Sequence, residues 1–197
     1  MNKMKTLIIV DFQFDFFNKK GALYVNDAEK AEKKIINLLN SNKDINNVIF
    51  TMDWHEYCDE SFEINGGKWP IHCLQNTIGA GVSEKLVKSC WQNGLVPEFI
   101  YKGDCPDIEE YGAFSKFYED STGVELTNHN TTNSVKILNK DVIVCGLAGD
   151  YCVKETIQNL LNANLNVEVF TDGIASIDDG TILNNFIQEN DLSVVKL

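Results

Sequence analysis

The stretch VCGLAGDYCVKETI, residues 144–157, passes from an apolar run through two glycines into a helical pattern. Apolar runs without alternation are typical of strands that are buried on both faces of a sheet. The helix that follows is predicted over 150–163. Its inward side chains would be Val153, Ile157, Leu160 and Leu161. A buried strand that leads directly into a helix indicates a parallel α/β sheet.

The same alternation extends in both directions along the chain. Apolar runs predict strands over 6–12, 46–53, 97–103, 141–146, 166–172 and 192–197, and helical periodicity predicts further helices over 27–40 and 182–190. No repeat or linker interrupts this order. The sequence therefore predicts one domain over 1–197, a doubly wound α/β fold with a mostly parallel sheet and helices on both faces.

Composition narrows the class of protein. The 197 residues are 44% hydrophobic and 23% charged, with a formal net charge of −12, which argues against a nucleic-acid partner because phosphates need basic footprints. Only four consecutive apolar residues precede Asp11, fewer than a signal peptide needs, and no run approaches the roughly 20 residues of a membrane span. We therefore expect a cytoplasmic protein without a membrane partner, in which the six cysteines are free thiols.

Reactive side chains follow the predicted strands. In parallel α/β sheets, ligands bind beyond the carboxyl ends of the strands. The first strand ends at Asp11, the second at Asp53, and the third near Lys102, and the fourth leads into the turn before Cys152. A thiol at a helix N-terminus beside a cation has a lowered pKa. Cys152 is therefore a candidate nucleophile, with Lys102 as the cation and Asp11 as the proton carrier.

The turn before Cys152 supplies a second element of such a site, since the open backbone N–H groups around Ala148 could hold an oxyanion. Each residue also has an ordinary interpretation. Asp11 could cap a turn, Lys102 could be solvated, Cys152 could be a small core residue, and His55 could be a surface imidazole. Their coincidence at one sheet edge favours a catalytic site. His129, in a polar segment, is predicted to be solvated.

The stretch DWHEYCDESFEINGGKWPIHC, residues 53–73, predicts a metal site. Asp53 and His55 share one side of an extended segment, and His72 returns after the loop. One carboxylate and two imidazoles suit one divalent ion of zinc, iron or manganese, with positions left for water or substrate. A solvated loop is the alternative. Candidates for the fourth ligand are water or the side chains of Glu60, Ser61 and Glu63.

Three motifs together resemble the cysteine-hydrolase family of nicotinamidases and isochorismatases. They are LIIVDFQFDF with GALYV, DWH with WPIHC, and GLAGDYCV, with Lys102 between the last two. The resemblance covers essentially the whole chain and implies a six-stranded, Rossmann-type three-layer fold. It also implies a Cys152–Asp11–Lys102 triad and a metal site of Asp53, His55 and His72. A cis peptide between Leu147 and Ala148 would turn the amides of Ala148 and Cys152 into an oxyanion hole. Substrate-binding residues would be Phe16, Trp69, Tyr111 and Leu147.

Within that family the sequence looks most like the nicotinamidases. The implied reaction is the metal-dependent hydrolysis of nicotinamide to nicotinate and ammonia through a thioester, as in NAD salvage, with zinc the expected metal. Alternatives are another small amide or ureido substrate, isochorismate, a receiver-type domain or an inactive binding protein. A homo-oligomer is compatible with the sequence. Departures from many members are Phe14 for Asn, Gly112 for Ser, Gly149 for Thr, and the absence of a further His in the metal loop.

Overall fold

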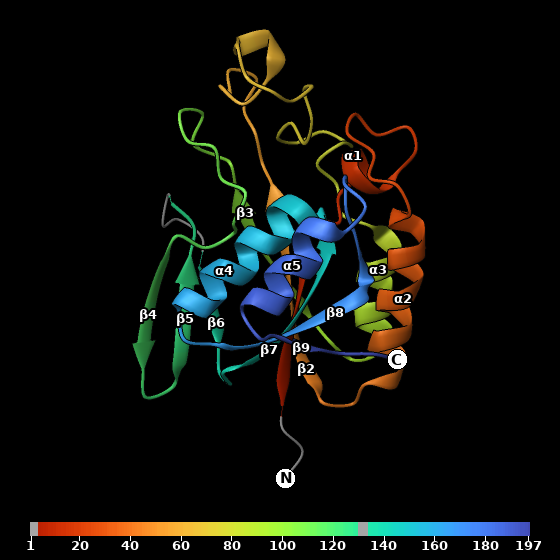
Figure 1. Ribbon diagram of the computed structural model, residues 1–197, viewed down its shortest axis with the longest axis vertical. Coiled ribbons are helices and arrows are strands. Elements are labelled where there is room, and N and C mark those ends of the chain that lie inside the picture. The colour runs from red at the N-terminus through yellow and green to blue at the C-terminus, as the bar shows by residue number, and fades with distance from the viewer. Residues whose placement is uncertain (1–3, 130–133) are drawn as a thin grey trace.

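Six parallel strands form the central sheet of the computed structural model, which describes residues 4–129 and 134–197 (Figure 1). In spatial order they are β3 (Pro97–Lys102), β2 (Ile45–Asp53), β1 (Lys5–Val10), β7 (Asp141–Leu147), β8 (Asn166–Ala175) and β9 (Ser193–Val194). Every neighbouring pair is parallel. The predicted fold class is confirmed.

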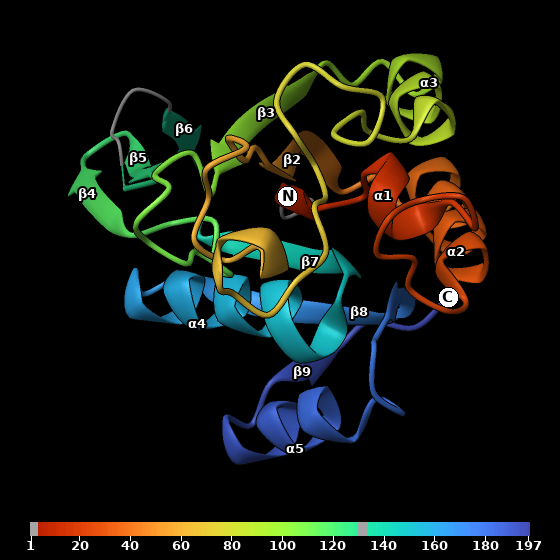
Figure 2. The ribbon, with the colours of Figure 1, turned by 90° about the horizontal axis from the view of Figure 1, so that it is seen from above.

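Helices cover both faces of this sheet (Figure 2). One face carries α1 (Phe14–Phe17), α2 (Ala28–Ser41) and α3 (Glu84–Gln92), and the other carries α4 (Lys154–Asn162) and α5 (Thr181–Glu189). A 3-10 turn, η1 (Glu63–Asn65), lies in the loop after β2, and a π-helical turn, η2 (Gly149–Val153), precedes α4. No helix in the described part of the chain is long and apolar enough to cross a membrane.

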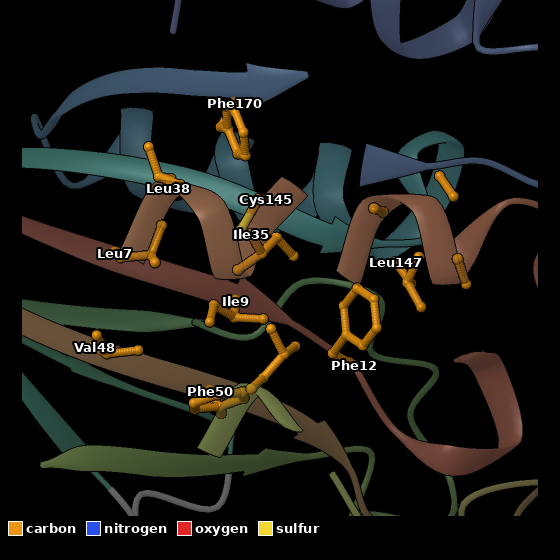
Figure 3. Close-up of a cluster of buried hydrophobic side chains, with 14 of the residues drawn as sticks. Leu7, Ile9, Phe12, Ile35, Leu38, Val48, Phe50, Cys145, Leu147 and Phe170 are labelled. Atoms are coloured by element: carbon orange, nitrogen blue, oxygen red, sulfur yellow. The ribbon is translucent and has the colours of Figure 1, made fainter. Parts of the chain in front are cut away.

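Strand β1 shows why its sequence is a continuous apolar run. Leu7 and Ile9 pack in the cluster under α2, and Figure 3 shows both among its side chains. Ile8 and Val10 pack in the opposite cluster with α4 and α5. All four side chains are fully buried. Each such burial stabilises the fold by about 1.5–3 kcal/mol, so the two helical layers are held to one strand from both sides.

Besides the four-residue helix α1, two parts of the fold were not predicted. The first is α3, which lies inside the long segment after β2 and is capped by the Ser83 hydroxyl accepting from Leu86 N. The second is a small antiparallel sheet of β4 (Lys116–Asp120), β5 (Gly123–Thr127) and β6 (Ser134–Ile137). Every residue of β4 is exposed, so that strand has no buried face to produce an apolar alternation.

The ends of the elements also differ from the sequence expectation. The helix predicted over 150–163 begins as the π-helical turn η2, and α4 starts only at Lys154. The last strand is confined to Ser193–Val194. The carboxyl ends of β1, β2, β3 and β7 all point to one edge of the sheet. The loop of residues 54–83 rises above that edge (upper part of Figure 1), where the candidate site lies.

Candidate functional site

Three strand ends bring the predicted triad together, and a fourth adds Asp53. Asp11 follows β1, Lys102 ends β3, and Cys152 lies in η2 directly after β7. Lys102 Nζ lies 3.0 Å from Asp11 Oδ2 and 3.7 Å from Cys152 Sγ. It also donates a short hydrogen bond to Asp53 Oδ1, its neighbour in the β2–β3 register. All four side chains are at least nine-tenths buried, so these contacts are shielded from solvent.

Asp11 is held by the neighbouring strand. Its backbone N donates to Thr51 Oγ1 and to Thr51 O, and Thr51 Oγ1 donates to Asp11 Oδ1 at 2.6 Å. Asp11 Oδ2 accepts no well-directed hydrogen bond from the described residues, although the Lys102 ammonium is beside it. One carboxylate oxygen of Asp11 and Cys152 Sγ belong, with Asp53, to a group whose ligand atoms are within 4.8 Å of one another. Asp11 therefore has one fixed oxygen and one available to a proton.

The pKa of Cys152 differs from the sequence expectation, which was a lowered value. Burial raises the pKa of the Cys152 thiol well above its usual value, and this outweighs the lowering by Lys102. Burial also raises the pKa of Asp11, against the effect of Lys102. For Lys102, burial favours the neutral amine, but Asp11 and Asp53 outweigh it and hold its pKa well above the usual value. These shifts favour the protonated thiol of Cys152 beside the fixed positive charge of Lys102.

The three predicted metal ligands also meet. His55 Nε2 and His72 Nε2 each lie 3.7 Å from Asp53 Oδ2, and the ligand atoms of the three residues are within 4.8 Å of one another. The Nδ1 atom of each imidazole contacts a different oxygen. His55 Nδ1 contacts Asp59 Oδ2 at 2.8 Å, and His72 Nδ1 contacts Pro70 O at 2.8 Å. Those partners place a ring proton on each Nδ1, so the Nε2 atoms, which face the Asp53 carboxylate, are the atoms available to a metal.

This donor set fits a divalent metal, because a carboxylate and two neutral imidazoles are common zinc ligands. Burial would raise the pKa of Asp53, but Lys102 and the two imidazoles outweigh it and hold it well below its usual range. The carboxylate is therefore ionised and ready to bind a cation. Among the candidate fourth ligands, Glu60 and Glu63 are exposed, whereas Ser61 lines the cleft and its buried Oγ has no partner within the described chain.

Both clusters open into one cleft, which encloses about 490 Å³ including its open mouth. Phe16, Trp69 and Tyr111 line it as predicted, together with Ala148 and Cys152. Trp69 Nε1 donates to Tyr111 OH at 3.1 Å, so these two rings form a linked wall. Sequence reasoning missed other lining side chains, namely Leu23, Val25, Glu109, Glu110, Tyr151 and Ile177.

Leu147 was predicted to bind substrate, but the structure places its side chain away from the cleft. It is fully buried in the apolar cluster under α2 and is not among the residues that line the cleft. Its peptide bond with Ala148 is cis, as the resemblance implied. The Ala148 carbonyl accepts from Val153 N at 3.0 Å, which closes the turn around Cys152. The Asp150 carboxylate accepts from the backbone N of Ile177 at 2.9 Å and so ties this turn to the loop after β8.

Residues 5–186 match the family model described as isochorismatase domain. The chain belongs to the isochorismatase family. It is 27% identical over 214 residues to a nicotinamidase of Saccharomyces cerevisiae, covering 94% of each chain. It resembles the solved structure of PnC1 from L. infantum in complex with nicotinate, with a TM-score of 0.78, 26% identity and coverage of 100% of this chain and 94% of that one. It also resembles pyrazinamidase of Pyrococcus horikoshii in complex with zinc, with a TM-score of 0.71, 26% identity and coverage of 98% and 99%.

This isochorismatase-family chain has local reasons for its departures from other members. A Cβ atom on Gly112 would overlap the Asn159 amide, whose oxygen accepts from Phe114 N at 3.0 Å. A Cβ atom on Gly149 would overlap Ser176 Oγ. Serine at the first position and threonine at the second would therefore require Asn159 and Ser176, respectively, to move. The loop after β2 does carry a further buried polar side chain, the carboxylate of Asp59.

Proposed function

We propose that the protein is a nicotinamidase, which hydrolyses nicotinamide to nicotinate and ammonia. The observation that carries the proposal is the single aromatic cleft into which both the Cys152 cluster and the Asp53 cluster open. A thiol beside a carboxylate acceptor is the arrangement that covalent amide hydrolysis needs. The curated relatives named nicotinamidase, and the related solved structure with bound nicotinate, support the same substrate.

In the first half of the reaction, the pyridine ring lies between Phe16 and Trp69, and the carboxamide carbon faces Cys152. Asp11 takes the thiol proton, and the thiolate attacks that carbon. The backbone N–H groups of Ala148 and Cys152 receive the oxyanion, and one such donor contributes roughly 10²–10³ in rate. Asp11 returns the proton to the amide nitrogen, the C–N bond breaks, and ammonia leaves a thioester on Cys152.

In the second half, water enters the space that ammonia has left. Asp11 takes a proton from the water as its oxygen attacks the thioester carbon. The same amides hold the second oxyanion. The C–S bond then breaks, the thiol regains its proton from Asp11, and the nicotinic acid that forms loses its proton to solvent and is released as nicotinate. Lys102 keeps its charge throughout and stabilises each state in which Asp11 or Cys152 is anionic.

The proposal includes one divalent metal, with zinc as the first choice, held by Asp53, His55 and His72. When bound, such an ion supplies a Lewis-acid site at the wall of the cleft. The zinc in the related pyrazinamidase structure supports this choice. The proposal also includes a reducing compartment, the cytoplasm, for which the free cysteines are the supporting observation.

The test is ammonia release from nicotinamide by the zinc-loaded protein and by its Cys152→Ala variant. We expect turnover by the wild type and a loss of at least about 10⁴-fold in the variant, because no other thiol faces Asp11 among the described residues. Cys58→Ala, at an exposed position, is the matched control and should retain full activity.

Two results would contradict the proposal. If the wild type releases no ammonia from nicotinamide with zinc, manganese or iron, the substrate assignment is wrong, and small acyclic amides become the next substrates to assay. If Cys152→Ala retains activity, Cys152 is not the nucleophile. Far-ultraviolet circular dichroism of both variants would establish that each is folded.

A further inference from the structure

Asp59 is a buried carboxylate behind the metal cluster that the proposed reaction does not use. It lies four residues after His55, and its Oδ2 contacts His55 Nδ1 at 2.8 Å. Its side chain is 3% exposed. It does not belong to the group of Asp53, His55 and His72 whose ligand atoms face one another. Asp59 therefore touches a metal ligand from behind rather than the metal position itself.

The Asp59 carboxylate is fixed on its other side as well. Its Oδ1 accepts from Ser61 N at 2.9 Å, and its backbone O accepts from Asn65 Nδ2 at 2.8 Å. Both carboxylate oxygens thus have a donor, and the residue is anchored to the loop by its main chain. This arrangement prevents free rotation of the carboxylate and holds His55 in one orientation.

The two imidazoles differ in the partner behind them. His72 Nδ1 faces the neutral carbonyl of Pro70, whereas His55 Nδ1 faces a carboxylate. A carboxylate behind a ligating histidine fixes its tautomer and increases its basicity. We propose that Asp59 is the positioning residue of this metal site, which keeps the His55 proton on Nδ1 and makes His55 Nε2 the stronger imidazole donor. This inference rests on the proposed function only in requiring that the cluster binds a divalent metal.

The variant Asp59→Asn distinguishes an effect on the His55 tautomer from simple support of the loop. The asparagine amide has one oxygen for two donors. If that oxygen stays on Ser61 N, the NH₂ group must face His55 Nδ1, which then accepts and moves the ring proton to Nε2. A protonated Nε2 cannot bind metal. Asp59→Asn should therefore weaken zinc binding at least as much as Asp59→Ala, although asparagine keeps the size of the side chain.

The experiment measures zinc dissociation constants by competition with a chromophoric chelator for the wild type and three variants. We expect the dissociation constant to rise about 10–100-fold in Asp59→Ala and by at least that factor in Asp59→Asn. Glu56→Gln is the control, because it removes the same charge from an exposed residue of the same loop, and it should stay within about twofold of the wild type. Urea unfolding of the metal-free proteins would show that each variant is folded.

Zinc binding in Asp59→Asn within about twofold of the wild type would overturn the proposal, as would a clearly smaller loss in Asp59→Asn than in Asp59→Ala. The latter order is what loop support alone would give. A wild type that binds no divalent metal would also overturn it. A wild type that binds zinc but releases no ammonia from nicotinamide would refute the proposed substrate and leave the role of Asp59 to be decided by the zinc measurements.

Discussion

At the scale of single residues, Thr51 has a larger role than its type suggests. It is fully buried in β2, and its hydroxyl donates to Asp11 Oδ1 at 2.6 Å. Thr51→Val keeps the shape and removes that donor. We expect kcat for amide hydrolysis to fall about 10–100-fold, because Asp11 loses the contact that orients it as a base. The free energy of unfolding should fall by about 1–3 kcal/mol, since a buried acceptor loses its partner.

The matched control for this prediction is Thr6→Val, the same substitution at a buried threonine near the other end of the sheet. It should leave kcat unchanged, whatever its effect on stability. Steady-state kinetics and urea unfolding on both variants separate the two effects. An unchanged kcat in Thr51→Val would show that Asp11 does not depend on Thr51 for its orientation.

At the scale of elements, the sequence predicted the strands that are buried on both faces, because burial makes their sequences continuous apolar runs. The runs that became β1, β2 and β7 are apolar on both faces because both faces are covered. By contrast, every residue of β4 is exposed, so its sequence has no apolar pattern that would indicate a strand. Its pairing with β5 could therefore not be predicted from either segment. The nine-residue helix α3 buries only Leu86, Ser89 and Cys90, too few to produce a clear helical period.

The pairing of β7 with β1 depends on Gly146. Its φ is +124°, and a Cβ atom there would overlap the backbone of Val10, its partner in the ladder. Gly146→Ala should lower the free energy of unfolding by about 3–5 kcal/mol, because neither strand can move without disturbing the core. Urea denaturation is the measurement.

Gly94→Ala is the control for Gly146. Gly94 also has a positive φ, +73°, but nothing lies within 4 Å of a Cβ atom there. That variant carries only the backbone strain and should lose about 1–2 kcal/mol. Equal losses in the two variants would mean that the approach of β1 to β7 adds nothing to the cost.

At the scale of the whole molecule, the order of strands explains which site residues could be predicted. Parallel strands deliver their carboxyl ends to one edge, so the amino-acid sequence was sufficient to predict that Asp11, Asp53 and Lys102 meet. The sequence was not sufficient to predict which residues contact the side chains of the site from behind. Thr51 and Asp59 make contacts that depend on strand register and on the path of a loop, and neither residue belongs to a sequence pattern that indicates such a contact.

The proposed metal site would join parts of the molecule that are distant in sequence. Asp53 ends β2, whereas His72 lies on the returning part of the loop above the sheet. Zinc at about 100 times its dissociation constant should stabilise the fold by about 2.7 kcal/mol, which corresponds to a rise in Tm of roughly 5–10 °C for a chain of this size. Removing zinc with a chelator should reverse the rise. Differential scanning calorimetry measures both.

His72→Ala should lose most of that zinc-dependent rise, because the loop would no longer be tied to the sheet through the metal. The control is His129→Ala, in which the side chain removed is 47% exposed and stands outside the cluster. It should keep the full rise. If His72→Ala kept it too, zinc would be stabilising the protein from some other position, and the link between loop and sheet would have to come from direct contacts, such as Trp54 N with Lys102 O of β3 at 2.8 Å.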